Sequence, residues 1–521
     1  MTVNSNAGPD KCARHTPKNQ GDAGRVIKNS IANVITGASI ALTAVVVPPV
    51  LARTLSPLDF GAWVLILQIA GYVKVLDLGM QGAVGRYVAY YLARCDALSA
   101  RQFASTAICL LFLAATLGAT AILVAAENLR LLFPQMPLPL FNSAKLAMAL
   151  VGVTVSIGLP ASVFRGILVG IERNELVTRI AAPSALMMCG GLIIVAVARA
   201  NVIDLALVYS IITLATYGLY WVTADKYGHL KLGASLFRRA LATETISYCS
   251  TTVIWSAAML FVSGLDVALV GRLDFRRVAV YAACVAPITI LAGAQNAMFG
   301  PMLQVGARYL AQGAMFRLKA LLERATRISV LLNLAYVVPL FLFSHAILKL
   351  WLGPQYAKQG TLILRLLLIG QAIRLIATPY ANLLLAIGQH HRTRVAPIVE
   401  GTANFTSALL LGMKFGAVGV AGAAIIGSVA AQLANYFYNF PRTPELIGVR
   451  SQLLWNAVGV PLMCLLPLML LWLPTMLPGL RESSVPLHVI AIIATSALMW
   501  RFGLAPIDKE LLSRAKSKLT N

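Results

Sequence analysis

Long runs of apolar residues, separated by short polar segments, make up most of the chain. A helix that crosses a bilayer needs about 20 mainly apolar residues, and the sequence contains fourteen such runs. Their approximate limits are 28–50, 61–83, 105–126, 145–169, 176–198, 203–223, 246–270, 278–300, 328–348, 361–386, 395–413, 418–440, 453–477 and 486–505. The pattern predicts an all-α polytopic membrane protein with about 14 transmembrane helices, or 12 if the weakest runs do not span.

The composition indicates the same class. Hydrophobic residues make up 59% of the 521 positions and charged residues 12%, whereas an ordinary soluble domain is about 25% charged. A soluble fold has no interior large enough for this apolar excess. Soluble enzymes and disordered proteins are therefore excluded.

Basic residues outnumber acidic ones, 43 to 19, which gives a formal net charge of +24. Because the cations lie in short segments between apolar runs, they indicate cytoplasmic membrane loops rather than a nucleic-acid-binding surface. With the N-terminus inside, most Lys and Arg residues fall on the inner side. We therefore expect a multi-pass protein with both termini in the cytoplasm.

A short internal match suggests two related halves, an organisation common in transporters. Gly85-Arg86-Tyr87-Val88 resembles Ala307-Arg308-Tyr309-Leu310. The expected parts are a disordered cytoplasmic tail at 1–24, an N-terminal lobe of six spans at 25–240, a C-terminal lobe of six spans at 241–445, two appended spans at 446–506 and a basic cytoplasmic tail at 507–521. Residues 301–327 predict an amphipathic helix on the inner membrane surface.

Arg374 lies near the centre of the expected tenth span, too deep to reach the interface easily. An ionisable group at that depth costs about 2.5–3.5 kcal/mol on insertion scales. Arg374 is therefore either half of a structural ion pair or a cavity-facing cation for an anionic substrate. Pro379, five residues later, predicts a kink in the same helix.

Other polar residues also fall inside expected spans. Lys74 and Asp77 are three positions apart on one helix face. They either pair with each other, or Lys74 lines a cavity and Asp77 responds to protonation. Asp266 and Glu400 are each either a proton or sodium site or an interfacial hydrogen-bonding group. Asn33 is either a helix–helix contact or a substrate contact.

No enzyme signature is present. The sequence contains no Walker A, HExxH or GxSxG motif, which argues against ATP-driven transport and membrane proteolysis. We expect no catalytic residues, no cofactor and no metal site.

Two segments resemble a known family. Residues 51–91 contain L-A-R-x-L-x-x-x-x-F-G, followed by Leu76-Asp77-Leu78-Gly79 and Arg86, and residues 265–271 are followed by Tyr281. These features resemble the polysaccharide-export flippases, the O-antigen branch of the multidrug/oligosaccharidyl-lipid/polysaccharide exporter superfamily. The resemblance implies two pseudo-symmetric lobes around a central cavity in the bacterial inner membrane.

The same resemblance implies movement of undecaprenyl-pyrophosphate-linked oligosaccharide, an O-antigen or exopolysaccharide unit, by ion-coupled alternating access. The expected substrate-binding residues are Arg374, Lys74, Arg86 and Asn33, and the expected ion-coupling residues are Asp77, Asp266 and Glu400. Expected partners are the lipid-linked oligosaccharide, a proton or sodium ion, membrane lipids and, as further candidates, other polysaccharide-assembly membrane proteins.

Two alternatives stay open. One is a multidrug or metabolite antiporter of the same superfamily, although cations within the spans favour an anionic substrate. The other is a polysaccharide polymerase or ligase, although the longest expected outer loop, 127–144, is short for such an enzyme.

Overall fold

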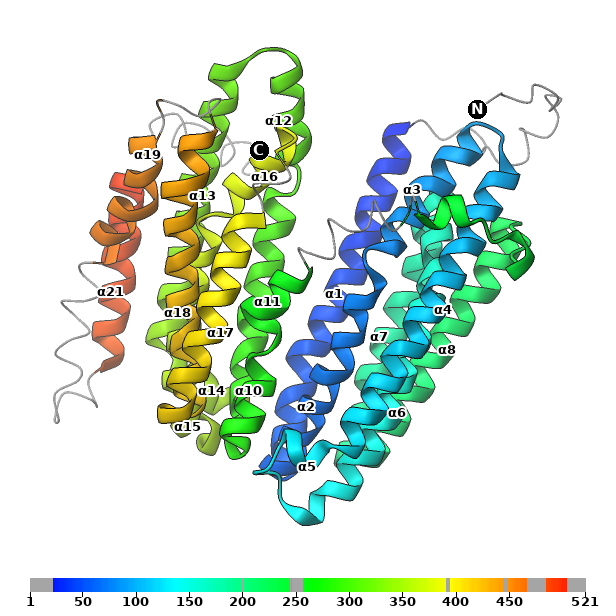
Figure 1. The fold of residues 1–521 in the computed structure, drawn as a ribbon. Coiled ribbons are helices and arrows are strands. Elements are labelled where there is room, and N and C mark those ends of the chain that lie inside the picture. The colour runs from blue at the N-terminus through cyan, green and yellow to red at the C-terminus, as the bar shows by residue number, and fades with distance from the viewer. Residues whose placement is uncertain are drawn as a thin grey trace, which may run out of the picture. The chain divides into compact units, whose positions relative to one another are not determined.

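The secondary structure of the protein is helical throughout the described part of the chain (Figure 1), which confirms the all-α fold class. The computed structural model describes residues 22–198, 201–243, 245, 256–389, 394–443, 448, 450–465 and 484–503. The expected tails at 1–24 and 507–521 therefore lie almost wholly outside the described residues.

Ten helices in the described ranges are long and apolar enough to cross a membrane. The number rises to eleven if the bent pair Ser256–Gly264 and Asp266–Leu273 forms one span. The expected count of fourteen is thus not reached there. The expected eleventh span is a helix, Val395–Phe415, but its polar residues keep it out of the ten. The expected thirteenth span runs beyond residue 465 and out of the described part.

The chain divides into two compact units. Unit 1 comprises Met1–Leu260 and Val270–Ala282, and unit 2 comprises Phe261–Leu269 and Ala283–Asn521. The main helices before the first boundary are α1 (Asp22–Thr54), α2 (Pro57–Tyr72), α3 (Met80–Ala93), α4 (Ala97–Glu127), α5 (Leu129–Leu132), α6 (Leu138–Gly170), α7 (Asn174–Val197) and α8 (Val202–Gly228).

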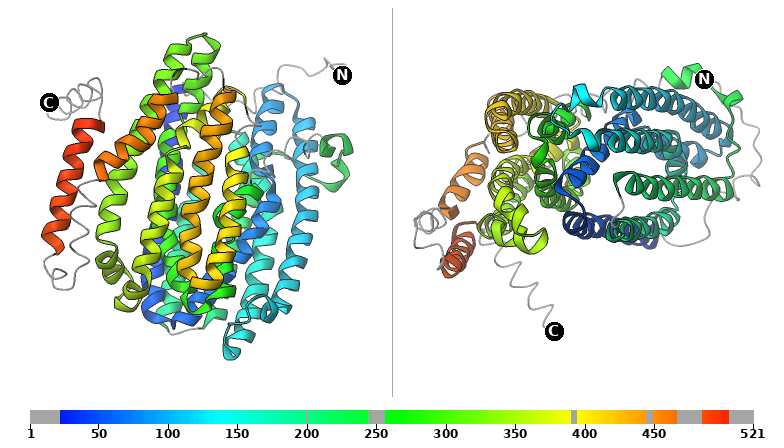
Figure 2. Two further views of the ribbon diagram at one scale, coloured as in Figure 1. Left: turned by 60° about the vertical axis from the view of Figure 1, so that its left-hand side comes forward. Right: turned by 90° about the horizontal axis from the view of Figure 1, so that it is seen from below.

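After that boundary follow α10 (Asp266–Leu273), α11 (Val278–Phe299), α12 (Met302–Ala311), α13 (Met315–Leu342), α14 (Ser344–Trp351), α15 (Pro354–Leu375), α16 (Thr378–Ala386), α17 (Val395–Phe415), α18 (Ala417–Ala434), α19 (Arg450–Leu454) and α21 (Ser484–Leu498). Within unit 2, α21 and residues 455–464 run alongside α13 (Figure 2). Leu331, Val460 and Ala491 share one buried cluster there, which fixes residues 455–464 and α21 to α13.

Equal span lengths support the internal repeat that the sequence suggests. The spans Pro57–Ala93 and Phe275–Ala311 each contain 37 residues, and the spans Leu138–Gly170 and Pro354–Ala386 each contain 33. The matched motifs both lie toward the end of their span in the first pair, Arg86 seven residues before Ala93 and Arg308 three residues before Ala311. The Arg86 guanidinium lies 5.9 Å from the ring centroid of the next tyrosine, and that of Arg308 lies 5.5 Å from its own.

Helices α3 and α6 meet backbone to backbone. Gly166 and Gly170 form a G-x-x-x-G spacing on α6, and small residues at this spacing let membrane helices approach closely. A Cβ atom on Gly170 would lie 2.8 Å from the Gly85 carbonyl oxygen, and one on Gly166 would lie 2.9 Å from that of Gln81. The contact fixes α3, which carries Arg86, against α6.

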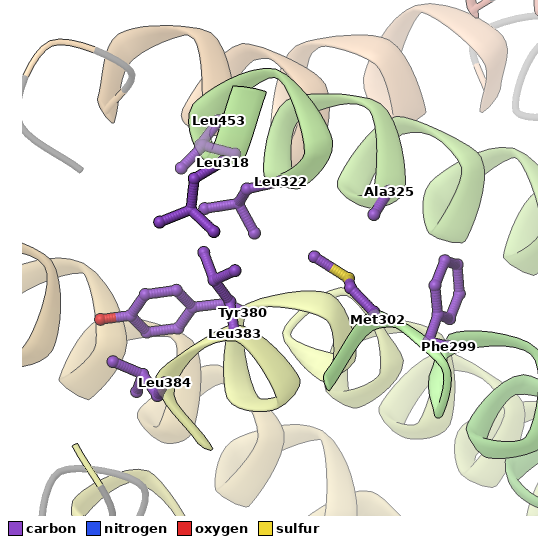
Figure 3. Close-up of a cluster of buried hydrophobic side chains, with 9 residues drawn as sticks. All are labelled: Phe299, Met302, Leu318, Leu322, Ala325, Tyr380, Leu383, Leu384 and Leu453. Atoms are coloured by element: carbon purple, nitrogen blue, oxygen red, sulfur yellow. The ribbon is translucent and has the colours of Figure 1, made fainter. Parts of the chain in front are cut away.

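The segment 301–327 differs from the surface helix expected for it. It forms α12 and the first part of α13, and the apolar face of that part is buried (Figure 3). Leu318 and Leu322 are fully buried in a cluster that includes Met302 and Leu383. The amphipathic pattern therefore reflects packing between helices rather than adsorption to the membrane surface. Phe316, on the opposite side, is exposed.

Replacing Gly170 with alanine is expected to destabilise the protein, because the new methyl group would collide with the Gly85 carbonyl. Overpacking of this kind costs about 1–3 kcal/mol. The measurement is the melting temperature of the purified protein in detergent. Gly218→Ala in α8 is the control, because a Cβ there meets nothing within 4 Å. Equal melting temperatures for the two variants would contradict the prediction.

Candidate functional site

The second expected span is broken in its middle. Helix α2 ends at Tyr72, residues Val73–Asp77 form a 3₁₀ turn (η2), and α3 begins at Met80. Leu78 and Gly79 between them have φ values of 54° and 76°. Glycine adopts this left-handed conformation freely, whereas leucine does so at a cost in strain. Non-helical backbone at membrane depth is tolerated where it is buried in protein or lines a water-filled cavity.

Lys74 and Asp77 both lie on this turn, but they do not pair. The Asp77 carboxylate accepts hydrogen bonds from Ser162 Oγ, at 3.0 Å, and from the backbone N–H of Gln81 in the first turn of α3. It therefore caps the helix that follows the break. Lys74 is exposed and forms no ion pair with any residue in the described ranges.

The other two substrate-binding candidates of the first lobe are less well defined by contacts. Arg86 is exposed on α3, the helix that directly follows the break. Asn33 lies in α1, in a stretch whose side chains are outside the described part of the chain.

Arg374, in the last turn of α15, is held in an ion pair. Its Nε donates to Glu400 Oε1 on α17 at 2.5 Å, and its Nη1 donates to Gln371 Oε1 at 3.2 Å. The side chain of Arg374 is 21% exposed and that of Glu400 is 8% exposed. Two predicted site residues are thus in direct contact. Of the two interpretations of Arg374, the ion pair is the arrangement observed.

Asn404 links this pair to Asp266. Its Nδ2 donates to Asp266 Oδ1 at 3.1 Å and to the Val262 carbonyl at 3.0 Å. Arg374 Nη2 reaches the same carbonyl at 3.5 Å. Val262 lies in a π-helical turn, η4 (Leu260–Gly264), after which the chain bends by 42° into α10. The amide of Asn404 therefore bridges the two sides of this bend.

These contacts define a buried polar network within unit 2. Asp266, Glu400 and Asn404 are all buried, and buried charges need pairing or hydrogen bonds. Such a network can hold a proton or a small cation on its carboxylates. Asn404 was not singled out from the sequence, although it lies four residues after Glu400 and thus on the same helix face.

A second polar cluster explains the break in the tenth span. Proline has no backbone N–H, so Pro379 leaves the Leu375 carbonyl without its helical donor. Gln295 Nε2 and Ser329 Oγ donate to that carbonyl at 3.2 and 3.0 Å. Helix α15 ends at Leu375 and α16 begins at Thr378, so the helix is interrupted at the position where a kink is predicted. In the described ranges, no three His, Cys, Asp or Glu residues are grouped to hold a metal ion.

Solved structures identify the fold. An inward closed conformation of the lipid II flippase MurJ matches with a TM-score of 0.69 and 13% identity, over 91% of this chain and 99% of that one. An inward-facing multidrug resistance MATE family transporter of the MOP superfamily matches with a TM-score of 0.66 and 15% identity, over 79% and 98%. A MOP superfamily transporter from Pyrococcus furiosus gives a TM-score of 0.53 and 15% identity, over 83% and 96%.

The protein therefore has the fold of MOP superfamily transporters. Its residues 26–304, more than half of the chain, match the family described as polysaccharide biosynthesis protein, and the chain belongs to that family. Comparison with curated proteins gives no match.

Replacing Arg374 with methionine is expected to destabilise the protein by about 3 kcal/mol, because Glu400 would remain buried without its cation. Adding Glu400→Gln to that variant should restore much of the loss. Thermal melts of the single and double variants measure both effects. The control is Lys145→Met, whose partner Glu127 is 67% exposed, so the expected loss is below about 1 kcal/mol. Equal losses for Arg374→Met and Lys145→Met would contradict the prediction.

Proposed function

We propose that this protein is a flippase for undecaprenyl-pyrophosphate-linked oligosaccharide, an O-antigen or exopolysaccharide unit. It works in the bacterial inner membrane by ion-coupled alternating access, with both termini in the cytoplasm. Membership of the polysaccharide biosynthesis family supports the substrate class. One structural neighbour is a lipid II flippase, which is consistent with a lipid-linked substrate for this protein.

The observation that carries the proposal is Lys74, an exposed basic residue on a broken membrane span. A pyrophosphate carries at least two negative charges, and charge-assisted hydrogen bonds to it are strong where the dielectric constant is low. Lys74 is the primary headgroup ligand in this proposal. Arg86 and Asn33 are further headgroup contacts, and the prenyl chain stays in the lipid.

Arg374 joins the substrate site when Glu400 takes up a proton. In the ion pair the guanidinium is occupied by the Glu400 carboxylate. A proton on Glu400 neutralises that carboxylate and weakens the pair, which frees the Arg374 donors for an anionic headgroup. Exchange of one anionic partner for another thereby couples proton uptake to substrate binding.

Asp266 and Asp77 are the remaining ion-coupling candidates. Asp266 is the first residue of α10, which follows a break, and Asp77 is the last residue of the 3₁₀ turn that precedes α3. Proton or sodium binding at Asp266 would alter its hydrogen bond with Asn404, and with it the bend before α10. Asp77 would act in the same way on the turn before α3.

An antiporter for drugs or metabolites is the second candidate, because a MATE transporter shares the fold. Cationic drugs require a site dominated by carboxylates, whereas Lys74 and Arg86 are exposed cations. Efflux of cationic dyes from whole cells would favour the antiporter. A polymerase or ligase would instead be indicated by loss of the lipid-linked intermediate on gene deletion.

Lys74→Ala is expected to reduce export about tenfold or more at a normal protein level, because a hydrogen bond to a charged group contributes about 1.5–3 kcal/mol. The measurement is the amount of lipid-linked intermediate left in the inner leaflet of cells that carry each variant. Lys74→Arg should retain function. Lys358→Ala, which removes another exposed lysine, is the control. Normal export with Lys74→Ala would contradict the proposed role of Lys74 as the headgroup ligand.

Glu400→Gln should tighten the binding of undecaprenyl pyrophosphate at a fixed pH, because Arg374 is then no longer held by a carboxylate. Affinity measured on the purified protein tests this, and Glu127→Gln, at an exposed ion pair, is the control. Equal affinities of Glu400→Gln and the wild type would refute the exchange of partners.

A further inference from the structure

A separate cavity of about 420 Å³ lies in unit 1, between α4 and the segment that follows α8. Its volume is within the range of ligand pockets, about 300–1,000 Å³. The lining residues are Ser105, Ile108, Cys109, Phe112, Leu232 and Gly233. Most of these side chains are apolar, and none belongs to the proposed transport site.

Specific hydrogen bonds build the wall of this cavity. Arg101 Nε donates to the Lys231 carbonyl at 3.0 Å, and the backbone N–H of Gly233 donates to Ser105 Oγ at 3.2 Å. Both bonds hold the segment after α8 against the first turns of α4. The cavity is therefore a defined groove between two fixed elements.

Three cations lie beside the groove. Arg101 and Lys231 are joined by the hydrogen bond to the Lys231 carbonyl. The backbone N–H of Arg238 donates to Thr106 Oγ1 at 3.1 Å, which places this residue beside α4. None of the three forms an ion pair within the described part of the chain. The apolar groove is thus bordered by positive charge that no carboxylate of the described residues neutralises.

The length of the groove suits a membrane lipid. With a helical rise of about 1.5 Å per residue, α4 extends about 16 Å from Arg101 to Phe112. Half the thickness of a hydrocarbon core is about 15 Å. Phe112 is 63% exposed, so the apolar part of the groove opens on the lipid-facing surface of α4. The groove thus has cations at its border and apolar side chains along the rest, which complements an amphiphile with an anionic head.

We infer that this groove binds an anionic phospholipid of the surrounding bilayer. Its phosphate lies among the cations at Arg101, Lys231 and Arg238, where each cation near an anionic lipid contributes about fivefold in affinity. One acyl chain follows α4 from Ile108 to Phe112. The bound lipid fastens the segment that leaves α8 to α4. This inference is independent of the transported substrate.

The test is native mass spectrometry of the purified full-length protein, titrated with phosphatidylglycerol or with phosphatidylcholine of the same acyl chains. We expect phosphatidylglycerol to bind the wild type at least fivefold more tightly. The double variant Arg101→Ala/Arg238→Ala should lose this preference. Cys109→Phe, which fills the groove but keeps every cation, should weaken phosphatidylglycerol binding. Arg179→Ala, an exposed cation in the first turns of α7, should bind like the wild type.

Equal binding of the two lipids, or unchanged phosphatidylglycerol binding in both groove variants, would overturn the inference. A melting temperature for each variant within the wild-type range excludes a general loss of folding, and Cys109→Phe supplies an independent reading if the double variant is unstable. Competition with undecaprenyl phosphate tests the other occupant. If that lipid displaces phosphatidylglycerol and binds the wild-type groove more tightly, the groove belongs to the prenyl carrier and the inference fails.

Discussion

A membrane-spanning helix can break only where other groups replace the hydrogen bonds that the break removes. Three breaks in this protein meet that requirement in the same way. Asp77 caps the first turn of α3 after the break in the second span. Asn404 donates to the Val262 carbonyl at the π-helical turn before α10. Gln295 and Ser329 donate to the Leu375 carbonyl before Pro379. Asp77, Asn404, Gln295 and Ser329 are thus polar residues within or beside apolar runs that stabilise irregular backbone.

The sequence predicted the parts of the structure that depend on local information. Runs of about 20 apolar residues specify helices because a bilayer leaves few other ways to satisfy the backbone, and Pro379 specifies a break because of its missing donor. The prediction of a helix on the membrane surface at 301–327 was wrong, because the apolar face of its part in α13 is buried between helices. Amphipathicity alone does not distinguish burial against lipid headgroups from burial against α12 and α16.

The candidate site was harder to predict, because its contacts join residues far apart in the chain. Arg374 was recognised as costly, but its partner Glu400 is 26 positions away on another helix, and no local rule connects them. Lys74 and Asp77 were close enough to suggest a pair. Asp77 instead contacts Ser162 and the backbone N–H of Gln81 in α3, after a turn in which Leu78 and Gly79 have positive φ values. Helix periodicity carries no sign of that turn.

Arg374 in unit 2 and Lys74 in unit 1 are both cations within expected spans, but they differ in whether a carboxylate neutralises them. In unit 2 the cost of placing Arg374 within a span is offset by Glu400, so the guanidinium is stable without a ligand. In unit 1 no ion pair among the described residues offsets the charge of Lys74. A protein built only for stability would replace Lys74 with an apolar residue at a gain of a few kcal/mol. An unneutralised cation at this position is consistent with selection for binding an anion, whereas the neutralised one in unit 2 would, in the proposed cycle, need a proton on Glu400 before it could do the same.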